Sequence, residues 1–467
     1  MLSFDKLPYS NRGKFFFKRL FQNRFSFAFF VVIFFQASAL AVLHAFLFTI
    51  DRNASQNIQS PPFVLPPRTF VKLEGPIFKV CNGTNLKAPA FDGTVECPVL
   101  AVNLEISPNL SISDGALASS AAGLAGPISF PLNVSQPCDT ALLWALEFFQ
   151  NSERDDLAFV ALQAWLLLIS ILSIFKESTP DLIGALATTL LSTIWSMFAI
   201  KLTATGRSNF QTFVIQGACA TALEEPGRAT ESLLLIGSAW DERLILNLVI
   251  LCFNLIGLVA SVVIARKMIK IFEVQRLAHA GSTEHINGIL NVALALSASF
   301  TLSSFVLVTS MCLWINQLFN GGAIEEFSLH TPLYKALYIS TLLLLIPWLA
   351  LGNIAIKHEN RRIMCTFLGI CFVIVCCWSI MFYSIVYRYT FLTWPFFATM
   401  TVTSFVLMIS TFIIGIACYR NFGKGLAHYL HVQRVLVDSD FASEYFTHDP
   451  RKPTIAIDPE TPALAKK

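Results

Sequence analysis

The chain has 467 residues, of which 55% are hydrophobic and only 13% are charged, and its formal net charge is +3. Soluble domains usually carry about a quarter charged residues, so the composition excludes an ordinary soluble protein. The small net charge gives no reason to expect nucleic acid as a partner. The expected surroundings of most of the chain are therefore a lipid bilayer.

Eight apolar stretches without any Asp, Glu, Lys or Arg run along the chain. About 20 apolar residues cross a bilayer core of about 30 Å. Lipid offers no hydrogen-bond partner to the backbone, so each stretch is expected to be a helix. The expected spans are residues 25–50, 157–175, 182–200, 244–265, 290–315, 336–356, 363–387 and 396–419. The predicted fold class is an all-α polytopic membrane protein with a small, disulfide-capable, partly β extracellular loop region.

Basic residues predict which way the chain faces. Residues 1–24 hold six Lys and Arg against one Asp, and residues 266–289 and 420–467 also carry clusters of Lys and Arg. The positive-inside rule places such segments in the cytoplasm. We therefore expect a plasma-membrane protein with both termini in the cytoplasm and with residues 51–156 and 201–243 outside.

The first expected outer loop carries four signals for N-glycosylation. The sequons begin at Asn53, Asn82, Asn109 and Asn133, and none has Pro in its middle position. A single sequon is a weak signal, but four in the one loop that the basic residues place outside agree with that placement. Asn53 is expected to be the poorest acceptor, because it lies nearest the membrane.

Cysteines in the two outer loops predict disulfide bonds. Cys81, Cys97 and Cys138 lie in the first loop, and Cys219 lies in the second. Four cysteines in an oxidising compartment suggest two bonds, one of which joins the loops. Three connectivities are open, and one bond with two free thiols is the alternative. Segments with strand-like alternation in the first loop predict a small β-rich module there.

Uncharged polar residues are the only candidates for chemistry inside the spans. Asn247 and Asn254 lie on one face of the fourth span, His44 lies in the first and Asn353 in the sixth. They could line a pathway for a neutral solute, but hydrogen bonding between helices is the favoured explanation. The chain contains no zinc-protease or phosphate-loop motif and no cluster of ligands at metal spacing. We therefore expect no enzyme activity, no cofactor and no metal.

The first span has a second interpretation. Basic residues followed by an apolar run and by Ala37-Ser38-Ala39 resemble a signal peptide with its cleavage site. The apolar run continues to residue 50, which favours an uncleaved anchor. Cleavage would leave seven spans with an outer N-terminus, which is the topology of a receptor.

The segment Asn421-Phe-Gly-Lys-Gly-Leu-Ala-His-Tyr-Leu430, followed by an acidic stretch over residues 438–446, resembles the C-terminal ends of polytopic membrane proteins of basidiomycete fungi. The overall layout also looks like that of the smut-fungus membrane proteins called "protein involved in tumors". This resemblance implies a plasma-membrane protein that acts with secreted effectors during plant infection. It brings no catalytic residues.

Uncharged spans and disulfide-capable outer loops together favour a non-enzymatic scaffold. In this interpretation, the outer loops bind secreted or cell-surface proteins and the helices hold the loops in place. The alternative functions are a transporter or channel for a neutral or lipidic solute and a seven-span receptor.

Overall fold

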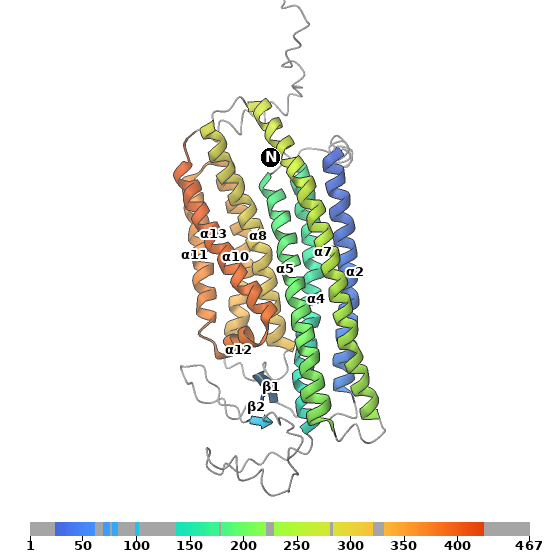
Figure 1. Cartoon of the computed structure of the whole chain (residues 1–467). Helices are drawn as coiled ribbons and strands as arrows, with labels where there is room; N and C mark the ends of the chain where they lie inside the picture. The colour runs from blue at the N-terminus through green and yellow to red at the C-terminus, as the bar shows by residue number, and fades with distance from the viewer. Residues whose placement is uncertain are drawn as a thin grey trace, which may run out of the picture.

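The computed structural model of the chain describes residues 24–60, 69–74, 77–82, 99–101, 137–176, 179–220, 228–280, 284–320 and 331–424. Long helices dominate this part of the chain (Figure 1). They are α2 (Arg24–Gln59), α4 (Pro137–Lys176), α5 (Thr179–Asn209), α7 (Arg228–Ala280), α8 (Glu284–Asn320), α10 (Thr331–His358), α11 (Arg361–Met381), α12 (Ile385–Thr393) and α13 (Pro395–Asn421). A π-helical segment, η3 (Phe210–Ala218), extends α5.

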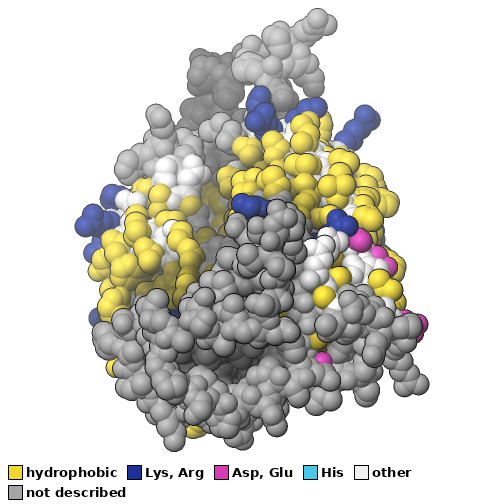
Figure 2. All heavy atoms as spheres, turned by 60° about the horizontal axis from the view of Figure 1, so that its bottom comes forward, with side chains coloured by type: hydrophobic (Ala, Val, Ile, Leu, Met, Phe, Trp, Pro, Cys, Tyr) yellow, Lys and Arg dark blue, Asp and Glu magenta, His cyan; other side chains and the backbone are white. Residues whose placement is uncertain are grey.

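Eight helices in the described residues are long and apolar enough to cross a membrane. The chain is therefore a multi-pass membrane protein, as the composition predicts. The side chains on the outside of these helices fit that environment. Phe35 and Ile256 are each 70% exposed and Ile346 is 69% exposed. Figure 2 shows hydrophobic side chains over the visible flanks of the helices, where acyl chains would surround them.

The helices form two rings of four. In the first bundle, α2 packs against α4, α4 against α5, α5 against α7, and α7 against α2. In the second bundle, α8, α10, α11 and α13 follow each other around the ring in the same order. The bundles stand side by side in Figure 1, and α8 meets α5 and α4 along the seam between them.

All four helices of the first bundle run well beyond the expected spans. Helix α2 continues past residue 50 to Gln59, and α5 continues past residue 200 to Asn209. Helix α4 begins at Pro137 instead of residue 157, and α7 begins at Arg228 instead of residue 244. Residues 51–156 and 201–243, expected as loops, therefore start and end inside helices. A charged residue marks each expected boundary, but it does not stop a helix when a neighbouring helix supplies the opposite charge.

The expected seventh span, residues 363–387, is interrupted. Helix α11 ends at Met381, and a short turn leads to α12. The turn is stabilised by Ser384, whose hydroxyl accepts a hydrogen bond from the backbone N–H of Tyr387 at 3.4 Å. A serine at this position caps the start of the next helix. Pro395 then begins α13, where the missing N–H of proline costs nothing.

Three short strands lie near the end of the molecule that holds α12. Strand β1 (Thr69–Glu74) pairs antiparallel with β2 (Ile77–Asn82), and β2 pairs with β3 (Val99–Ala101). Figure 1 places β1 and β2 below the helices at that end. So little strand does not establish a β-rich module, and most of residues 61–136 lies outside the described residues.

Candidate functional site

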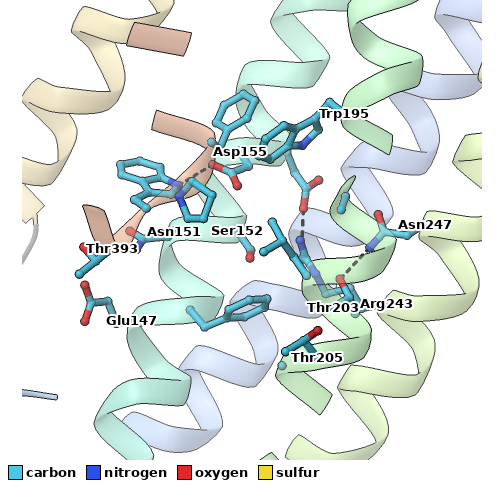
Figure 3. A pocket seen from close by; sticks show the side chains of 18 of the residues that line it. Glu147, Asn151, Ser152, Asp155, Trp195, Thr203, Thr205, Arg243, Asn247 and Thr393 are labelled. Atoms are coloured by element: carbon cyan, nitrogen blue, oxygen red, sulfur yellow. Dashed lines mark hydrogen bonds and ion pairs between the residues drawn. The ribbon is translucent and has the colours of Figure 1, made fainter. Parts of the chain in front are cut away.

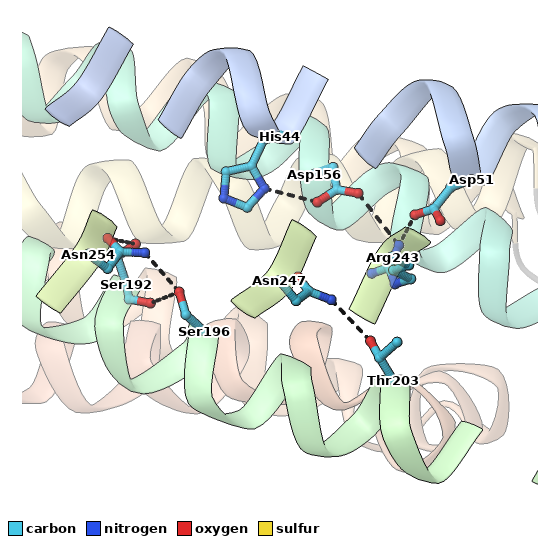
Figure 4. Close-up of polar contacts among 9 residues, drawn as sticks. All are labelled: His44, Asp51, Asp156, Ser192, Ser196, Thr203, Arg243, Asn247 and Asn254. Atoms are coloured by element: carbon cyan, nitrogen blue, oxygen red, sulfur yellow. Dashed lines mark hydrogen bonds and ion pairs between the residues drawn. The ribbon is translucent and has the colours of Figure 1, made fainter. Parts of the chain in front are cut away.

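Four ionisable side chains meet inside the first bundle and form what we call the charge network: His44 and Asp51 on α2, Asp156 on α4 and Arg243 on α7. Arg243 Nη1 pairs with Asp51 Oδ2 and lies 3.7 Å from Asp156 Oδ2. Asp156 Oδ1 is 3.0 Å from His44 Nδ1. Figure 4 shows these contacts joining three helices. The charge network ties α2, α4 and α7 together near the α12 end of the bundle.

The charge network is buried almost completely. His44 is 5% exposed, Asp51 0%, Asp156 3% and Arg243 6%. Burying an ion is costly unless it is paired and hydrogen-bonded. Yet a buried atom on each of the four residues has no hydrogen-bond partner among the described residues: His44 Nε2, Asp51 Oδ1, Asp156 Oδ2 and Arg243 Nε. The charge network therefore costs folding free energy. Such buried charges are typical of functional sites in membrane helices.

A cavity of about 310 Å³ adjoins the charge network. His44, Asp156 and Arg243 are part of its wall, and α5 supplies Ser196, Thr203 and other residues. The far wall comes from α12 and the start of α13 (Figure 3). The cavity therefore lies at the seam, between the first bundle and the segment of α12 and the start of α13 that connects α11 to α13. Its volume suits a small molecule.

One stripe of α4 brings acidic side chains into the cavity. Glu147, Asn151 and Asp155 follow each other at intervals of four residues, so they share one face of the helix. Asp155 Oδ1 accepts a hydrogen bond from Trp394 Nε1 at 2.9 Å. Glu147 makes no hydrogen bond or salt bridge with the described residues, and no dashed line reaches its carboxylate in Figure 3. The Arg154 guanidinium on the same helix acts on this carboxylate electrostatically. The cavity thus holds a carboxylate that is available to a ligand.

Aromatic rings complete the cavity wall. Trp144, Trp195 and Trp394 line it together with Tyr389 and three phenylalanines. Burial and the nearby Glu147 carboxylate raise the pKa of the Tyr389 phenol well above its ordinary value, so Tyr389 stays neutral. Acidic groups and aromatic faces are the two features that proteins use to hold organic cations. The guanidinium of Arg243, also in the wall, is already occupied by Asp51 and Asp156.

The polar residues expected inside the spans occupy different places. Asn247 Nδ2 donates to Thr203 Oγ1 at 3.1 Å, one helical turn from Arg243, and it lines the cavity. Asn254 Nδ2 donates to Ser196 Oγ at 2.8 Å, and Asn254 Oδ1 accepts from Ser192 Oγ at 3.3 Å. These bonds join α5 to α7 (Figure 4).

Asn353 lies away from the other candidates. It is on α10 in the second bundle, and its amide donates only to the backbone carbonyl of Leu349, at 2.9 Å. The structure therefore brings His44 and Asn247 to the cavity, places Asn254 farther along the same bundle and leaves Asn353 outside.

One disulfide bond joins the two expected outer loops. Cys138, at the start of α4, is bonded to Cys219, just after η3. This is one of the pairings that the sequence leaves open, and it ties the beginning of α4 to the end of the α5–η3 helix. Cys81 lies in β2, and Cys97 lies outside the described residues. A bond between these two cysteines stays a prediction.

The glycosylation candidates are only partly described. Asn53 lies on the exposed side of α2, two residues after buried Asp51. Its sequon ends at Ser55, which is 6% exposed and donates a hydrogen bond to the carbonyl oxygen of Arg52. Asn82 ends β2, and Asn109 and Asn133 lie outside the described residues. Glycosylation at all four positions, and the expectation that Asn53 is the poorest acceptor, stay predictions.

Comparison with known proteins adds no identification: no protein-family model, no curated protein and no solved structure matches the chain. The functional argument therefore depends on the geometry of the site.

The most informative residues of the site, Asp51, Asp156 and Arg243, were missed in the sequence. Each lies one position outside an expected span, next to residues 50, 157 and 244, where a charge looks like an ordinary span boundary. The spacing of Glu147, Asn151 and Asp155 was the available signal, because polar residues four apart suggest one polar helix face. The sequence analysis placed the functional site in the outer loops because the expected spans are uncharged. The buried charge network provides a second candidate site, inside the first bundle.

Proposed function

We propose that this chain is a non-enzymatic membrane carrier whose cavity binds a small organic cation, such as a protonated amine. The observation that carries the proposal is the Glu147 carboxylate, which lines an aromatic-walled cavity and makes no hydrogen bond or salt bridge with the described residues. Arg154 acts on it electrostatically, and a cationic ligand in the cavity would pair with it directly.

The charges around the cavity favour a cation over an anion. Its wall contains three carboxyl groups, Glu147, Asp155 and Asp156, and one guanidinium, that of Arg243. Arg243 is held by Asp51 and Asp156, so it offers little to an incoming anion. A neutral solute, the alternative suggested by the sequence, would leave Glu147 without a direct salt-bridge partner.

The aromatic residues support the same ligand class. Trp394 and Tyr389 come from the region around α12, while Trp144 and Trp195 come from α4 and α5. Rings from both bundles therefore line the same cavity as Glu147 and Asp155. The Trp394 ring already holds a cation, the Arg154 guanidinium, 5.7 Å from its centroid. A cation over an aromatic face gains roughly 0.5–2 kcal/mol, and more when water is excluded.

Three probes of similar shape and different charge test the proposal: 2-phenylethylammonium, 2-phenylethanol and phenylacetate. Binding to the purified protein in detergent can be followed by calorimetry and by the fluorescence of the tryptophans in the wall. We expect the cation to bind at least about tenfold more tightly than the alcohol, as a gain near 1.4 kcal/mol requires. Phenylacetate should not bind measurably.

Two variants that each remove one negative charge locate the site. Glu147→Gln should weaken binding of 2-phenylethylammonium about tenfold or more, because a charge-assisted hydrogen bond contributes roughly 1.5–3 kcal/mol. Glu242→Gln is the matched control, since Glu242 is exposed on α7 and does not line the cavity. Equal binding of the three probes, or equal loss in both variants, would contradict the proposal.

Transport is tested separately in vesicles that contain the purified protein. Uptake of labelled 2-phenylethylammonium should exceed that of empty vesicles and should fall in the Glu147→Gln variant. Binding without uptake would reduce the proposal from a carrier to a ligand-binding membrane protein.

A docking function for the outer segments remains a second proposal. One observation favours it: the Cys138–Cys219 bond joins the two expected outer loops. In this proposal residues 51–156 and 201–243 bind secreted or cell-surface proteins at the plasma membrane, with both termini in the cytoplasm. Co-purification in mild detergent with and without residues 61–136 tests it, and an unchanged set of partners would contradict it.

A further inference from the structure

The charge network carries one more acid than base when its two carboxylates are ionised. Asp51 and Asp156 share the single guanidinium of Arg243, so two negative charges face one positive charge. The two carboxylates and the guanidinium together then carry a net charge of −1. A buried net charge is unfavourable in a medium of low dielectric constant, so a second cation stabilises the charge network whenever both carboxylates are ionised.

The imidazole of His44 is the place where a proton can supply that charge. His44 Nδ1 is 3.0 Å from Asp156 Oδ1 and donates to it when the carboxylate is ionised. The other ring nitrogen, Nε2, is buried and has no hydrogen-bond partner among the described residues. A proton that binds at Nε2 makes the charge network neutral without moving any helix.

A ligand in the cavity can supply the same charge. His44 and Asp156 both line the cavity, as Glu147 and Asp155 do. An organic cation near these carboxylates lies next to the imidazole, and two positive charges at this distance repel each other. The proton on His44 and the cation in the cavity therefore oppose each other, because each adds a positive charge beside Asp156.

The charged and titratable groups around His44 agree with this balance. On α2, the helix that carries His44, the charged group is Asp51. Helix α4 contributes Glu147, Asp155, Asp156 and, behind the cavity wall, Arg154, while α7 contributes Arg243 and α12 contributes Tyr389. The α5 residues in the wall carry no titratable side chain. His44 is thus the one imidazole among four carboxyl groups and two guanidinium groups in the described residues here.

We infer that the carrier exchanges its organic cation for a proton: binding of the cation in the cavity releases one proton from His44, and proton uptake releases the cation. One monovalent cation replaces one proton, so the charge of the occupied site is conserved. The inference rests on the proposed function, because it names the ion that is coupled to the proposed ligand.

The affinity for 2-phenylethylammonium, measured as a function of pH, tests the inference. This probe stays a cation throughout the range of about pH 5 to pH 8 in which histidine titrates. Competition with one proton predicts that the affinity falls by up to about tenfold for each unit by which the pH is lowered. In weakly buffered solution a pH indicator should record up to one proton released for each probe bound.

Two histidine variants separate His44 from other titrating groups. Gln can still donate a hydrogen bond to Asp156 but cannot take up a proton, so the His44→Gln variant should lose both the pH slope and the proton release. His358→Gln is the matched control, because His358 is exposed at the far end of α10. This control should show the same dependence of affinity on pH as the unmodified protein.

The outcomes distinguish the two proposals. Tight binding of the probe with a constant affinity and no proton release would overturn proton exchange and leave the proposed function standing. A slope that persists in the His44→Gln variant would overturn the assignment to His44. Absence of binding at every pH would overturn both.

Discussion

The two bundles have the same ring of four helices, but their interiors differ. The first bundle buries the charge network and the Asn254 cluster between its helices. In the described residues of α8, α10, α11 and α13, the buried polar side chains are uncharged. Ser303 and Thr411 form one hydroxyl pair there, and Ser310 and Thr401 form another. Similar backbones thus carry a site in one bundle and a mostly apolar support in the other.

Aromatic packing explains how the second bundle holds together without charges. Trp314 lies against Tyr387 with ring centroids 4.9 Å apart, and Trp348 stacks on Phe367 at 5.2 Å. Such contacts add about 0.5–1.5 kcal/mol each beyond burial. The second bundle gains stability from shape, whereas the first gains it partly from charges that must remain balanced. This difference predicts that polar substitutions in the two bundles will have unequal effects.

The largest expected effect comes from removing the guanidinium of the charge network. Arg243→Met leaves Asp51 and Asp156 buried without a counter-charge, and breaking a buried pair costs about 3–5 kcal/mol of unfolding free energy. Denaturant unfolding in detergent measures the loss. Adding Asp51→Asn should recover part of it, because one of the two carboxylates is then neutral. A loss as small as that of Glu242→Gln would show that the charge network does not stabilise the first bundle.

The disulfide bond should have the next largest effect. Replacing Cys138 and Cys219 together by Ser is expected to cost about 2–4 kcal/mol, since the bond closes a loop with a sequence separation of 81 residues. Thermal unfolding of the reduced protein should show the same loss. Replacing Cys312 by Ser in α8 is the control, because that cysteine is free and exposed. Equal stability of the double variant and the control would contradict a structural role for the bond.

A close contact between helices should give an intermediate effect. At Gly257 on α7, an added Cβ would lie 2.2 Å from Gln36 Cδ on α2. Gly257→Ala must displace this buried amide and is expected to cost about 1–3 kcal/mol. Gly237→Ala, on the same helix, meets no atom within 4 Å and should be neutral or slightly stabilising. Thermal shifts of the two variants check the contrast.

Single hydrogen bonds should have the smallest effects on stability. Asn254→Leu removes contacts to Ser192 and Ser196, and Thr411→Val removes contacts to Ser299 and Ser303. Interhelical hydrogen bonds in membranes contribute about 0.6 kcal/mol on average and about 1.7 at most. We expect Asn254→Leu near the upper value and Thr411→Val near the average. The reverse order in unfolding experiments would remove the contrast between the bundles.

Peptide mapping extends the comparison to the outer loops. Because Cys138 is bonded to Cys219, Cys81 and Cys97 are the remaining pair of the four. Digestion without reducing agent, followed by mass spectrometry, should yield one peptide pair with each bond. Free thiols at Cys81 and Cys97 would contradict the second bond.

The helical membrane fold could be predicted from the sequence because each span is apolar by itself. Hydropathy examines one segment at a time, so it ends a span where Asp51, Asp156 or Arg243 appears. The compensation of these charges involves partners up to 192 positions apart, which no local pattern contains. The cavity was equally hidden, because its walls combine α4 and α5 with the distant residues around α12.

Trp394 has a mechanical consequence for the molecule. It lies between α12 and α13, yet its indole N–H donates to Asp155 on α4, so this bond crosses the seam between the bundles. Each four-helix bundle would keep its own internal contacts if the two bundles tilted against each other as rigid bodies. Such a rocking motion would stretch the indole–carboxylate bond and change the width of the cavity at once. The same carboxylate therefore links the two bundles and forms part of the cavity wall.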